Sequence, residues 1–158
     1  MNNSFVMGVD IGGTNTVYGF INNKGEIIES NQIPTNGNFP VSNLLDRLEL
    51  YLNNFKELNP NLILKGIGIG APNGNHFSGI IENPPNINWG DVKIKSILEK
   101  KLLCDVIITN DANAAALGEK NYGVAKYMNN FIMITLGTGL GSGIFSEGKL
   151  LYGNDGLA

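Results

Sequence analysis

Short apolar segments alternate with helical patterns along this chain. Three strand-like runs follow one another at residues 5–11, 17–21 and 27–33, before any helical spacing appears. Three successive strands before the first helix predict a mixed sheet, since parallel neighbours would need a crossover connection. In the helical stretch that follows, apolar residues recur at three- and four-residue intervals, at Val41, Leu44, Leu45, Leu48, Leu52 and Phe55.

The second half of the chain continues the alternation of strands and helices. A strand-like run at residues 62–71 is followed by a loop and by a helix for which Asp91 is the expected N-cap. The apolar positions of that helix are Ile94, Ile97, Leu98 and Leu102. A short strand at 106–109, a helix of small residues and a hairpin region complete the chain. We therefore predict the α/β class, with a mixed sheet and flanking helices.

A glycine-rich turn follows the first predicted strand, in the order Asp10, Gly12, Gly13, Thr14 and Asn15. An unpaired buried carboxylate is costly, so Asp10 is expected at the strand end, where a hydrated cation is its natural partner. The two glycines allow a tight turn whose backbone N–H groups can point at a phosphate, and Thr14 and Asn15 add donors. The alternative is an ordinary hairpin turn, in which Thr and Asn are common.

A second glycine-rich segment, residues 135–143, lies between two apolar runs. Its alternating glycines suit a close approach of the backbone to a polyanion, or a hairpin whose glycines avoid side-chain clashes. Dinucleotide and P-loop fingerprints are excluded, because the chain has no GxGxxG and Leu150 stands where a P-loop needs Ser or Thr. We interpret Gly148-Lys149 as a hairpin turn.

Asn110 and Asp111 stand where an apolar strand gives way to a helix of small residues, in the sequence NDANAAALGE. A helix N-terminus has partial positive charge and free N–H groups, which favour a carboxylate there. An ionised carboxylate beside an open cleft can accept the proton of a hydroxyl nucleophile. The alternative is that Asp111 is only the helix N-cap, a position at which Asp and Asn are favoured.

Composition narrows the class of protein. The chain has 158 residues, of which 42% are hydrophobic, and a net charge of −3 without a basic cluster, which argues against nucleic-acid binding. No apolar run reaches membrane-spanning length and no leader precedes the first strand, so we expect no membrane partner and a cytoplasmic location. The single cysteine, Cys104, is expected to be buried, and the single histidine, His76, to be a solvated loop residue; together they exclude an internal zinc site of the usual kind.

Three motifs in one order, DIGGT, NDANAAALGE and TLGTGLGSGI, resemble the ROK (repressor, open reading frame, kinase) family, from about residue 5 to the end of the chain. The resemblance implies the actin-like ATPase and hexokinase (ribonuclease H-like) fold, in which ATP and a sugar meet in a cleft between two α/β lobes. It implies Asp111 as the catalytic base, Asn110 as a partner of a sugar hydroxyl, and Asp10 as a holder of Mg²⁺ through water. The phosphate-binding residues that it implies are Gly12, Gly13, Thr14 and Asn15 in the first loop and Gly137, Thr138 and Gly139 in the second.

Two further segments resemble the sugar-contacting loops of ROK kinases. Asn73 and Gly74 follow a strand in the sequence APNG, where the family often has Ala-Pro-Gly. Residues 82–89 resemble the family's Pro-Asn-Leu…Trp segment, and Asn86 offers both a donor and an acceptor to a hydroxyl. The resemblance therefore implies Asn73, Gly74 and Asn86 as substrate-binding residues; the alternative is ordinary turn chemistry in an Asn-rich chain.

The resemblance covers only part of a ROK kinase. We expect residues 1–124 to form the N-terminal lobe and residues 125–158 to begin a second lobe that is truncated. ROK kinases continue with a Glu-X-Gly-His segment that completes the sugar site and with a cysteine-rich zinc motif, so zinc is expected only in the missing C-terminal part. We interpret the chain as an N-terminal fragment with little turnover of its own, from a protein that is a homo-oligomer when full length.

The predicted function is that of an ATP-dependent sugar kinase similar to glucokinase, which transfers a phosphoryl group from MgATP to a hexose hydroxyl. The alternative is a sugar-sensing transcription regulator of the same family without kinase activity. Such regulators carry an N-terminal DNA-binding extension, whereas the first predicted strand here begins at about Phe5. A chaperone-type ATPase relative is a third class, which the Asn110-Asp111 pair disfavours. Glucose, fructose, N-acetylmannosamine and N-acetylglucosamine all remain open as the sugar.

Overall fold

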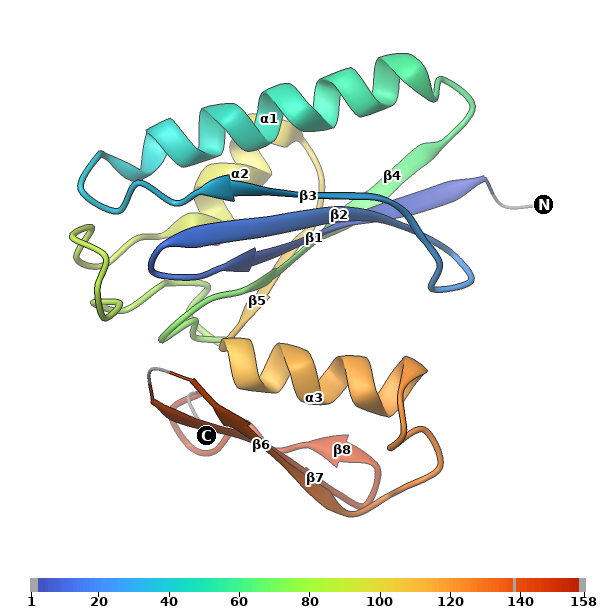
Figure 1. Cartoon of the computed structure of the whole chain (residues 1–158), viewed down its shortest axis with the longest axis vertical. Helices are drawn as coiled ribbons and strands as arrows, with labels where there is room; N and C mark the ends of the chain where they lie inside the picture. Colours follow the sequence, from blue (N-terminus) through green and yellow to red (C-terminus); the bar gives the residue numbers. More distant parts are fainter. Residues whose placement is uncertain (1–2, 138, 157–158) are drawn as a thin grey trace.

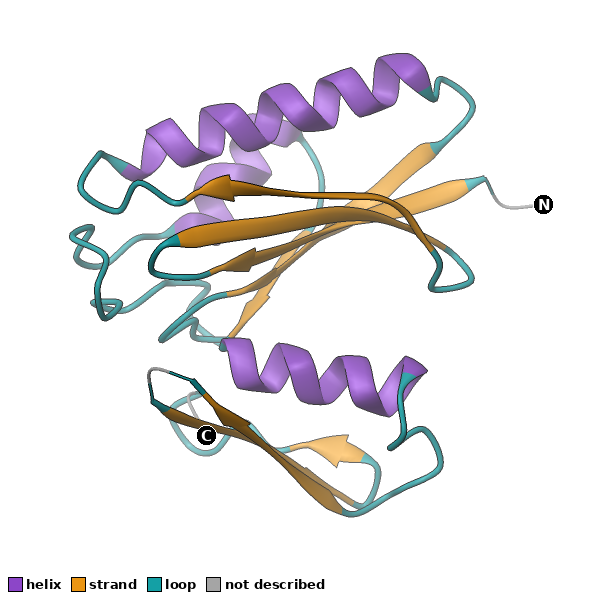
Figure 2. Ribbon diagram, viewed as in Figure 1, coloured by secondary structure: helices purple, strands orange, loops and turns teal. Residues whose placement is uncertain are grey.

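The computed structural model describes residues 3–137 and 139–156. Figures 1 and 2 show a larger sheet with helices on both sides, and a smaller sheet beyond α3. In chain order the elements are β1 (Ser4–Ile11), β2 (Asn15–Asn22), β3 (Ile27–Pro34), α1 (Val41–Leu58), β4 (Ile63–Gly70), α2 (Ile94–Leu102), β5 (Val106–Thr109), α3 (Asp111–Tyr122), β6 (Phe131–Leu136), β7 (Leu140–Ser146) and β8 (Lys149–Leu150).

The larger sheet has the strand order β3-β2-β1-β4-β5. β1 pairs antiparallel with β2, and β2 with β3, because short turns join these strands. β1 pairs parallel with β4, and β4 with β5, and the chain passes through α1 and α2 to make these connections. The mixed α/β sheet predicted from the order of the elements is therefore confirmed.

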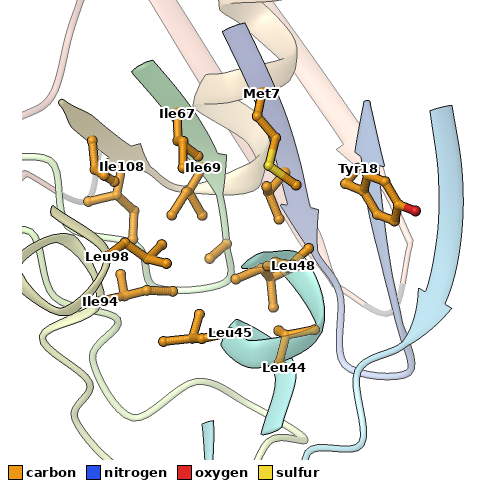
Figure 3. Close-up of a cluster of buried hydrophobic side chains, with 14 of the residues drawn as sticks. Met7, Tyr18, Leu44, Leu45, Leu48, Ile67, Ile69, Ile94, Leu98 and Ile108 are labelled. Carbon is orange, nitrogen blue, oxygen red and sulfur yellow. The ribbon is translucent and has the colours of Figure 1, made fainter. Parts of the chain in front are cut away.

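One face of this sheet is buried under α1 and α2, in a core of aliphatic and aromatic side chains (Figure 3). Phe55 of α1 stacks on Phe20 of β2 with ring centroids 3.9 Å apart, and its centroid lies 5.0 Å from that of Phe5 in β1. Such aromatic pairs contribute about 0.5–1.5 kcal/mol beyond their buried area, so they help to hold α1 across the antiparallel strands. The buried residues of α1 are Leu44, Leu45, Leu48, Leu52 and Phe55, which are positions that the helical spacing predicted.

The opposite face of the larger sheet is less covered. Val6 and Val17 on this face are 41% exposed and Ile107 is 59% exposed. A cavity of about 780 Å³ lies between this face and α3, and Asp10 is among its lining residues. Because Asp10 has the same parity along β1 as Val6, its side chain points to the side on which α3 and the smaller sheet lie.

α3 packs closely on the smaller sheet, which has the order β6-β7-β8. Gly143 of β7 lies against the helix: a Cβ there would be 2.5 Å from Ala116 Cβ and 2.9 Å from the Ala112 carbonyl oxygen. Gly141 faces the helix in the same way, with its Cβ position 3.0 Å from Ala112 Cβ. Part of the second glycine pattern therefore serves helix packing. α3 also contacts β4 of the larger sheet. The expected division of the chain into two lobes at residue 124 stays a prediction.

The start of α2 differs from the prediction. Asp91 is not its N-cap: Lys93 occupies that position without a side-chain hydrogen bond, and Asp91 Oδ1 instead accepts the Asn83 N–H at 3.0 Å. The helix begins later because Val92 exchanges both backbone hydrogen bonds with Ile81 and is held extended.

The burial of the single histidine and the single cysteine also differs from the prediction. His76 is half-buried rather than solvated, with its ring stacked on Tyr152 at a centroid distance of 4.0 Å. Cys104 is only half-buried, at the edge of the core, and loss of solvation raises the pKa of its thiol. Gly148 does lie in the turn between β7 and β8, while Lys149 already begins β8. Within the described ranges, no helix is long and apolar enough to cross a membrane.

Candidate active site

A cleft of about 1070 Å³ lies between loops of the larger sheet and the β6–β7 hairpin. Its walls come from the turn after β1, the loop after β4, the start of α3 and the hairpin. The predicted site residues that line it are Gly12, Gly13, Thr14, Asn73, Asn86, Asn110, Asp111, Gly137 and Gly139. Asp10, Asn15 and Gly74 are not part of this lining, and Thr138 lies outside the described residues. The fold thus gathers segments that are far apart in the sequence.

The first residues of α3 divide two tasks between them. Asn110 is the N-cap, and its Oδ1 accepts the Asn113 N–H at 2.7 Å. Asp111 is the first helical residue; its carboxylate is exposed, and Oδ1 accepts the Ala112 N–H at 2.8 Å. Asp111 is therefore not the N-cap, while its role as a base stays a prediction. Since Asn110 Oδ1 is engaged in capping, its Nδ2 amide is the group that could donate to a hydroxyl.

Asp10 and Asp111 approach each other beside Gly70, at the end of β4. A Cβ at Gly70 would lie 3.8 Å from Asp10 Oδ1 and 3.6 Å from the Asp111 Cα. Loss of solvation raises the pKa of Asp10, and the charge of Asp111 raises it further.

These residues fit a hydrated Mg²⁺, which is commonly held by one or two carboxylates plus water. A divalent cation would offset the repulsion between Asp10 and Asp111. Thr109 is among the residues that line the cavity of about 780 Å³ beside Asp10, and its Oγ1 is buried without a hydrogen-bond partner in the described part of the chain. No group of three or more His, Cys, Asp or Glu that could hold a metal occurs among residues 3–137 and 139–156.

The turn between β1 and β2 is closed by a hydrogen bond within it and is held by a side chain just after the end of β3. Gly12 N–H donates to the Asn15 carbonyl at 2.9 Å, so this N–H is not free for a phosphate. Thr35 Oγ1 donates to the Gly12 carbonyl at 2.7 Å and lies 2.8 Å from Thr16 Oγ1. Because the one hydroxyl proton of Thr35 is used on Gly12, Thr16 must donate to Thr35. Neither threonine stood out in the sequence, because only the pairing of β2 with β3 brings Thr35 to the turn.

The loop after β4 uses Asn73 and Gly74 in different ways. Asn73 has φ +52°, a conformation that Asn tolerates better than most residues, which explains how it can stand where the family often has glycine. Its Nδ2 donates to the Glu82 carbonyl at 3.0 Å, so Oδ1 is the atom left for a sugar hydroxyl. Gly74 is buried, and a Cβ there would clash with the Thr109 carbonyl oxygen. Gly74 therefore positions the loop against β5.

The second glycine segment forms the open end of the β6–β7 hairpin. Gly137 N–H donates to the Gly139 carbonyl at 3.0 Å, and a Cβ at either glycine would meet no described atom within 4 Å. On the other side of the cleft, a Cβ at Gly13 would lie 3.3 Å from Asn86 Cβ. The two predicted phosphate loops and one predicted sugar loop therefore border one open space.

Comparison with known proteins shows where this arrangement recurs. The ROK family pattern matches residues 6–158. A glucokinase from Halalkalibacterium halodurans is 39% identical over 163 residues, which cover 100% of this chain and 49% of that protein. A xylose repressor from Caldicellulosiruptor bescii is 42% identical over 94 residues, 59% of this chain and 24% of the repressor.

The likeness extends to three dimensions. The crystal structure of a ROK family glucokinase from Streptomyces griseus, in complex with glucose and AMPPNP, matches with a TM-score of 0.84 and 32% identity, over 98% of this chain and 48% of that one. The chain thus spans about half the length of the glucokinases that it matches. The predicted actin-like ATPase fold is confirmed by this likeness and by that to a Thermus thermophilus ROK hexokinase. Because both the family's sequence pattern and its fold extend over nearly the whole chain, this protein belongs to the ROK family.

Proposed function

We propose that this chain is the N-terminal part of an ATP-dependent hexose kinase of the glucokinase type. The observation that carries the proposal is the exposed carboxylate of Asp111, placed at the first residue of α3 in a cleft bordered by both glycine loops. Glucokinases among the similar proteins support this choice of reaction. The glucose and AMPPNP in the Streptomyces griseus enzyme support a hexose and ATP as substrates.

In the proposed reaction, Asp111 accepts the proton of a hexose hydroxyl while the hydroxyl oxygen attacks the γ-phosphorus of ATP, and the bond from that phosphorus to the β–γ bridging oxygen breaks to release ADP. The hydrogen bond from the Ala112 N–H fixes Oδ1 of Asp111, so Oδ2 is the oxygen that faces the hydroxyl. The turn at Gly13-Thr14 and the open end of the β6–β7 hairpin hold the phosphates, and positioning contributes most of the rate enhancement.

Three amide side chains would read the sugar hydroxyls: Asn110 through Nδ2, Asn73 through Oδ1, and Asn86. Asp10 would hold Mg²⁺ through water. The metal, when bound, neutralises negative charge on the phosphate oxygens. From the resemblance to ROK kinases we also infer a cytoplasmic location, a homo-oligomeric complete protein and a zinc motif beyond residue 158.

Ligand binding to the 158-residue chain, followed by NMR, tests this function. Glucose is expected to shift the amide resonances of Asn86 and Asn110, and MgAMPPNP those of Gly13 and Thr14. myo-Inositol, a cyclic polyol that is not a hexose, is the control and should shift neither group. Glucose shifts that are absent, or that are spread evenly over the surface, would contradict the proposed site. Sugar-stimulated ADP release by this chain at ordinary kinase rates of about 1–100 s⁻¹ would contradict its status as a fragment.

A sugar-sensing regulator is the second candidate, because a xylose repressor matches 59% of the chain. A regulator needs the sugar contacts of the cleft but not the phosphate loops. Binding of glucose without any response to MgAMPPNP would therefore favour the regulator. Binding of both ligands would favour the kinase.

A further inference from the structure

Asn75 is a buried polar residue that the proposed mechanism does not use. It is 7% exposed and belongs to the loop after β4, residues 72–82, here named the substrate loop. Its Oδ1 accepts the N–H groups of Phe77 at 2.9 Å and Ser78 at 3.1 Å, which forms a turn inside the loop. Its Nδ2 donates to Glu82 Oε1 at 2.8 Å, at the other end of the same loop.

The second donor of Asn75 leaves the substrate loop. Nδ2 also donates to the Asp155 carbonyl oxygen at 2.8 Å. Asp155 lies in residues 152–156, here named the C-terminal segment, which follows β8 of the smaller sheet. Asn75 is thus a direct hydrogen-bonded link between a loop of the larger sheet and a segment attached to the smaller one.

A ring contact beside this hydrogen bond joins the same two segments. The rings of His76 and Tyr152 are stacked, with centroids 4.0 Å apart and an interplanar angle of 9°. His76 Nδ1 lies 3.2 Å from the carbonyl oxygen of Ile108 in β5, the strand that leads into α3. Two adjacent residues of the substrate loop therefore contact the C-terminal segment, and one of them also contacts the strand that precedes the proposed base.

We propose that Asn75, together with His76, is a tether that positions the substrate loop against the C-terminal segment. The tether sets where Asn73, three residues before His76, stands relative to the β6–β7 hairpin across the cleft. Its role in sugar binding rests on the proposed function, whereas its mechanical role does not. The hydrogen bond and the ring stack act on the same short segment, so loss of either contact is expected to loosen that segment.

Asn75→Asp is the informative substitution, because it keeps the Oδ1 acceptor that closes the turn but removes both Nδ2 donors. The new carboxylate would also repel Glu82, so the double variant N75D/E82Q separates that repulsion from the lost bond to Asp155. Asn59→Asp is the matched control, since it removes a side-chain amide donor that bonds only at the C-terminal end of α1. Tyr152→Ala removes the ring that stacks on His76 and leaves the hydrogen bonds inside the substrate loop intact.

NMR order parameters of residues 152–156, measured on the 158-residue chain, report the tether directly. In N75D, N75D/E82Q and Y152A we expect them to fall from about 0.85 to below about 0.6, the range of flexible backbone. N75D and N75D/E82Q should also lose the Overhauser contacts between the His76 and Tyr152 rings, and N59D should match the wild type in both measurements. Wild-type order parameters in N75D, or their recovery in N75D/E82Q, would overturn the proposal, because recovery would assign the loosening to charge repulsion.

Glucose affinity then separates the positioning role from the proposed function. Where glucose binds the wild-type chain, N75D is expected to raise the Kd at least tenfold, about 1.4 kcal/mol, and N59D to leave it unchanged. An equal Kd for N75D and the wild type would overturn the positioning role. If the wild-type chain binds no glucose, the proposed sugar site fails, while the order parameters still decide whether the tether exists.

Discussion

Thr35→Val should weaken the turn that carries the first glycine segment. Thr35 is 1% exposed and Thr16 is fully buried, and their hydroxyls form a chain in which Thr16 donates to Thr35, and Thr35 to the Gly12 carbonyl. Valine has nearly the shape of threonine but no hydrogen-bonding group in its side chain. T35V therefore breaks both bonds and leaves the Thr16 hydroxyl buried without its partner.

The size of the effect follows from this geometry. A net hydrogen bond contributes about 0.5–1.5 kcal/mol, and a buried group left without a partner costs about 1–3 kcal/mol. The extra buried methyl group of valine offsets about 0.8 kcal/mol. We expect T35V to lower the free energy of unfolding by about 2–3 kcal/mol, which is about 4–12 °C in Tm for a chain of this size. T16V, which leaves the Thr35–Gly12 bond in place, should cost about 1 kcal/mol.

Urea unfolding of the wild type, T16V, T35V and the double variant measures these free energies. The double variant has no buried hydroxyl without a hydrogen-bond partner. Its free energy of unfolding should therefore fall by about 1–2 kcal/mol less than the sum of the two single losses. T35S keeps the hydroxyl and is the control, with a loss of about 1 kcal/mol for the missing methyl group. The reasoning would be refuted if the losses of T16V and T35V added up to that of the double variant, or if T35V were as stable as T35S.

Three further outcomes are expected. Asp111→Asn keeps the shape of the first residue of α3 but removes the base, so kcat of a complete protein that contains this chain should fall by about 10²–10⁴; near-normal kcat would refute the role. Gly143→Ala should lower stability in urea unfolding by about 1–3 kcal/mol, because its Cβ would lie 2.5 Å from Ala116 Cβ. Gly118 lies in α3, the helix against which Gly143 packs, at a position where a Cβ would meet no described atom within 4 Å. Gly118→Ala should therefore raise stability by about 0.5–1 kcal/mol. Equal effects of the two glycine substitutions would contradict the packing argument. Because the pKa of Asp10 is raised above its ordinary value of 3.8, the native state binds the proton more tightly than the unfolded chain, and stability is lost as the pH rises through the raised pKa. Asp10→Asn should remove this loss, so its Tm should exceed that of the wild type at neutral pH and approach it in acid; parallel Tm curves would argue against the shift.

Local periodicity was enough to predict most of the helices and strands, whereas the actin-like ATPase fold was predicted from the family resemblance. The apolar spacing of residues 41–55 predicted α1, because one face of a helix must be buried against the sheet, and the buried positions agree. The start of α2 could not be predicted in this way. Asp91 is a good N-cap by type, but the pairing of Ile81 with Val92 keeps the chain extended past it. That pairing joins residues eleven apart through a loop, and local pattern contains no trace of it.

In the candidate site, too, local motifs could be predicted from the sequence, whereas long-range contacts could not. Its glycine turns and the Asn110-Asp111 pair are contiguous motifs, so the sequence was sufficient to single them out, and most of these residues line one cleft. Their roles in binding and catalysis stay predictions. The residues that hold the motifs in place, such as Thr35 and Asn75, reach their distant partners Gly12 and Asp155 through strand pairing or through the return of the chain after β8. No spacing rule connects such residues, so only the folded structure reveals them.

The capping of α3 by Asn110 has an evolutionary consequence. Loss of an N-cap costs about 0.5–2 kcal/mol, whereas substitution of an exposed residue usually changes stability by less than about 0.5 kcal/mol. Because Asn110 caps the helix and the exposed Asp111 contributes a hydrogen bond to the Ala112 N–H, selection can act on the proposed base at a smaller cost to the helix than a change of the cap would bring. The proteins similar to this chain include both a glucokinase and a xylose repressor. With the cap and the proposed base on separate residues, drift at position 111 could abolish catalysis in a descendant, while purifying selection preserves the scaffold around it.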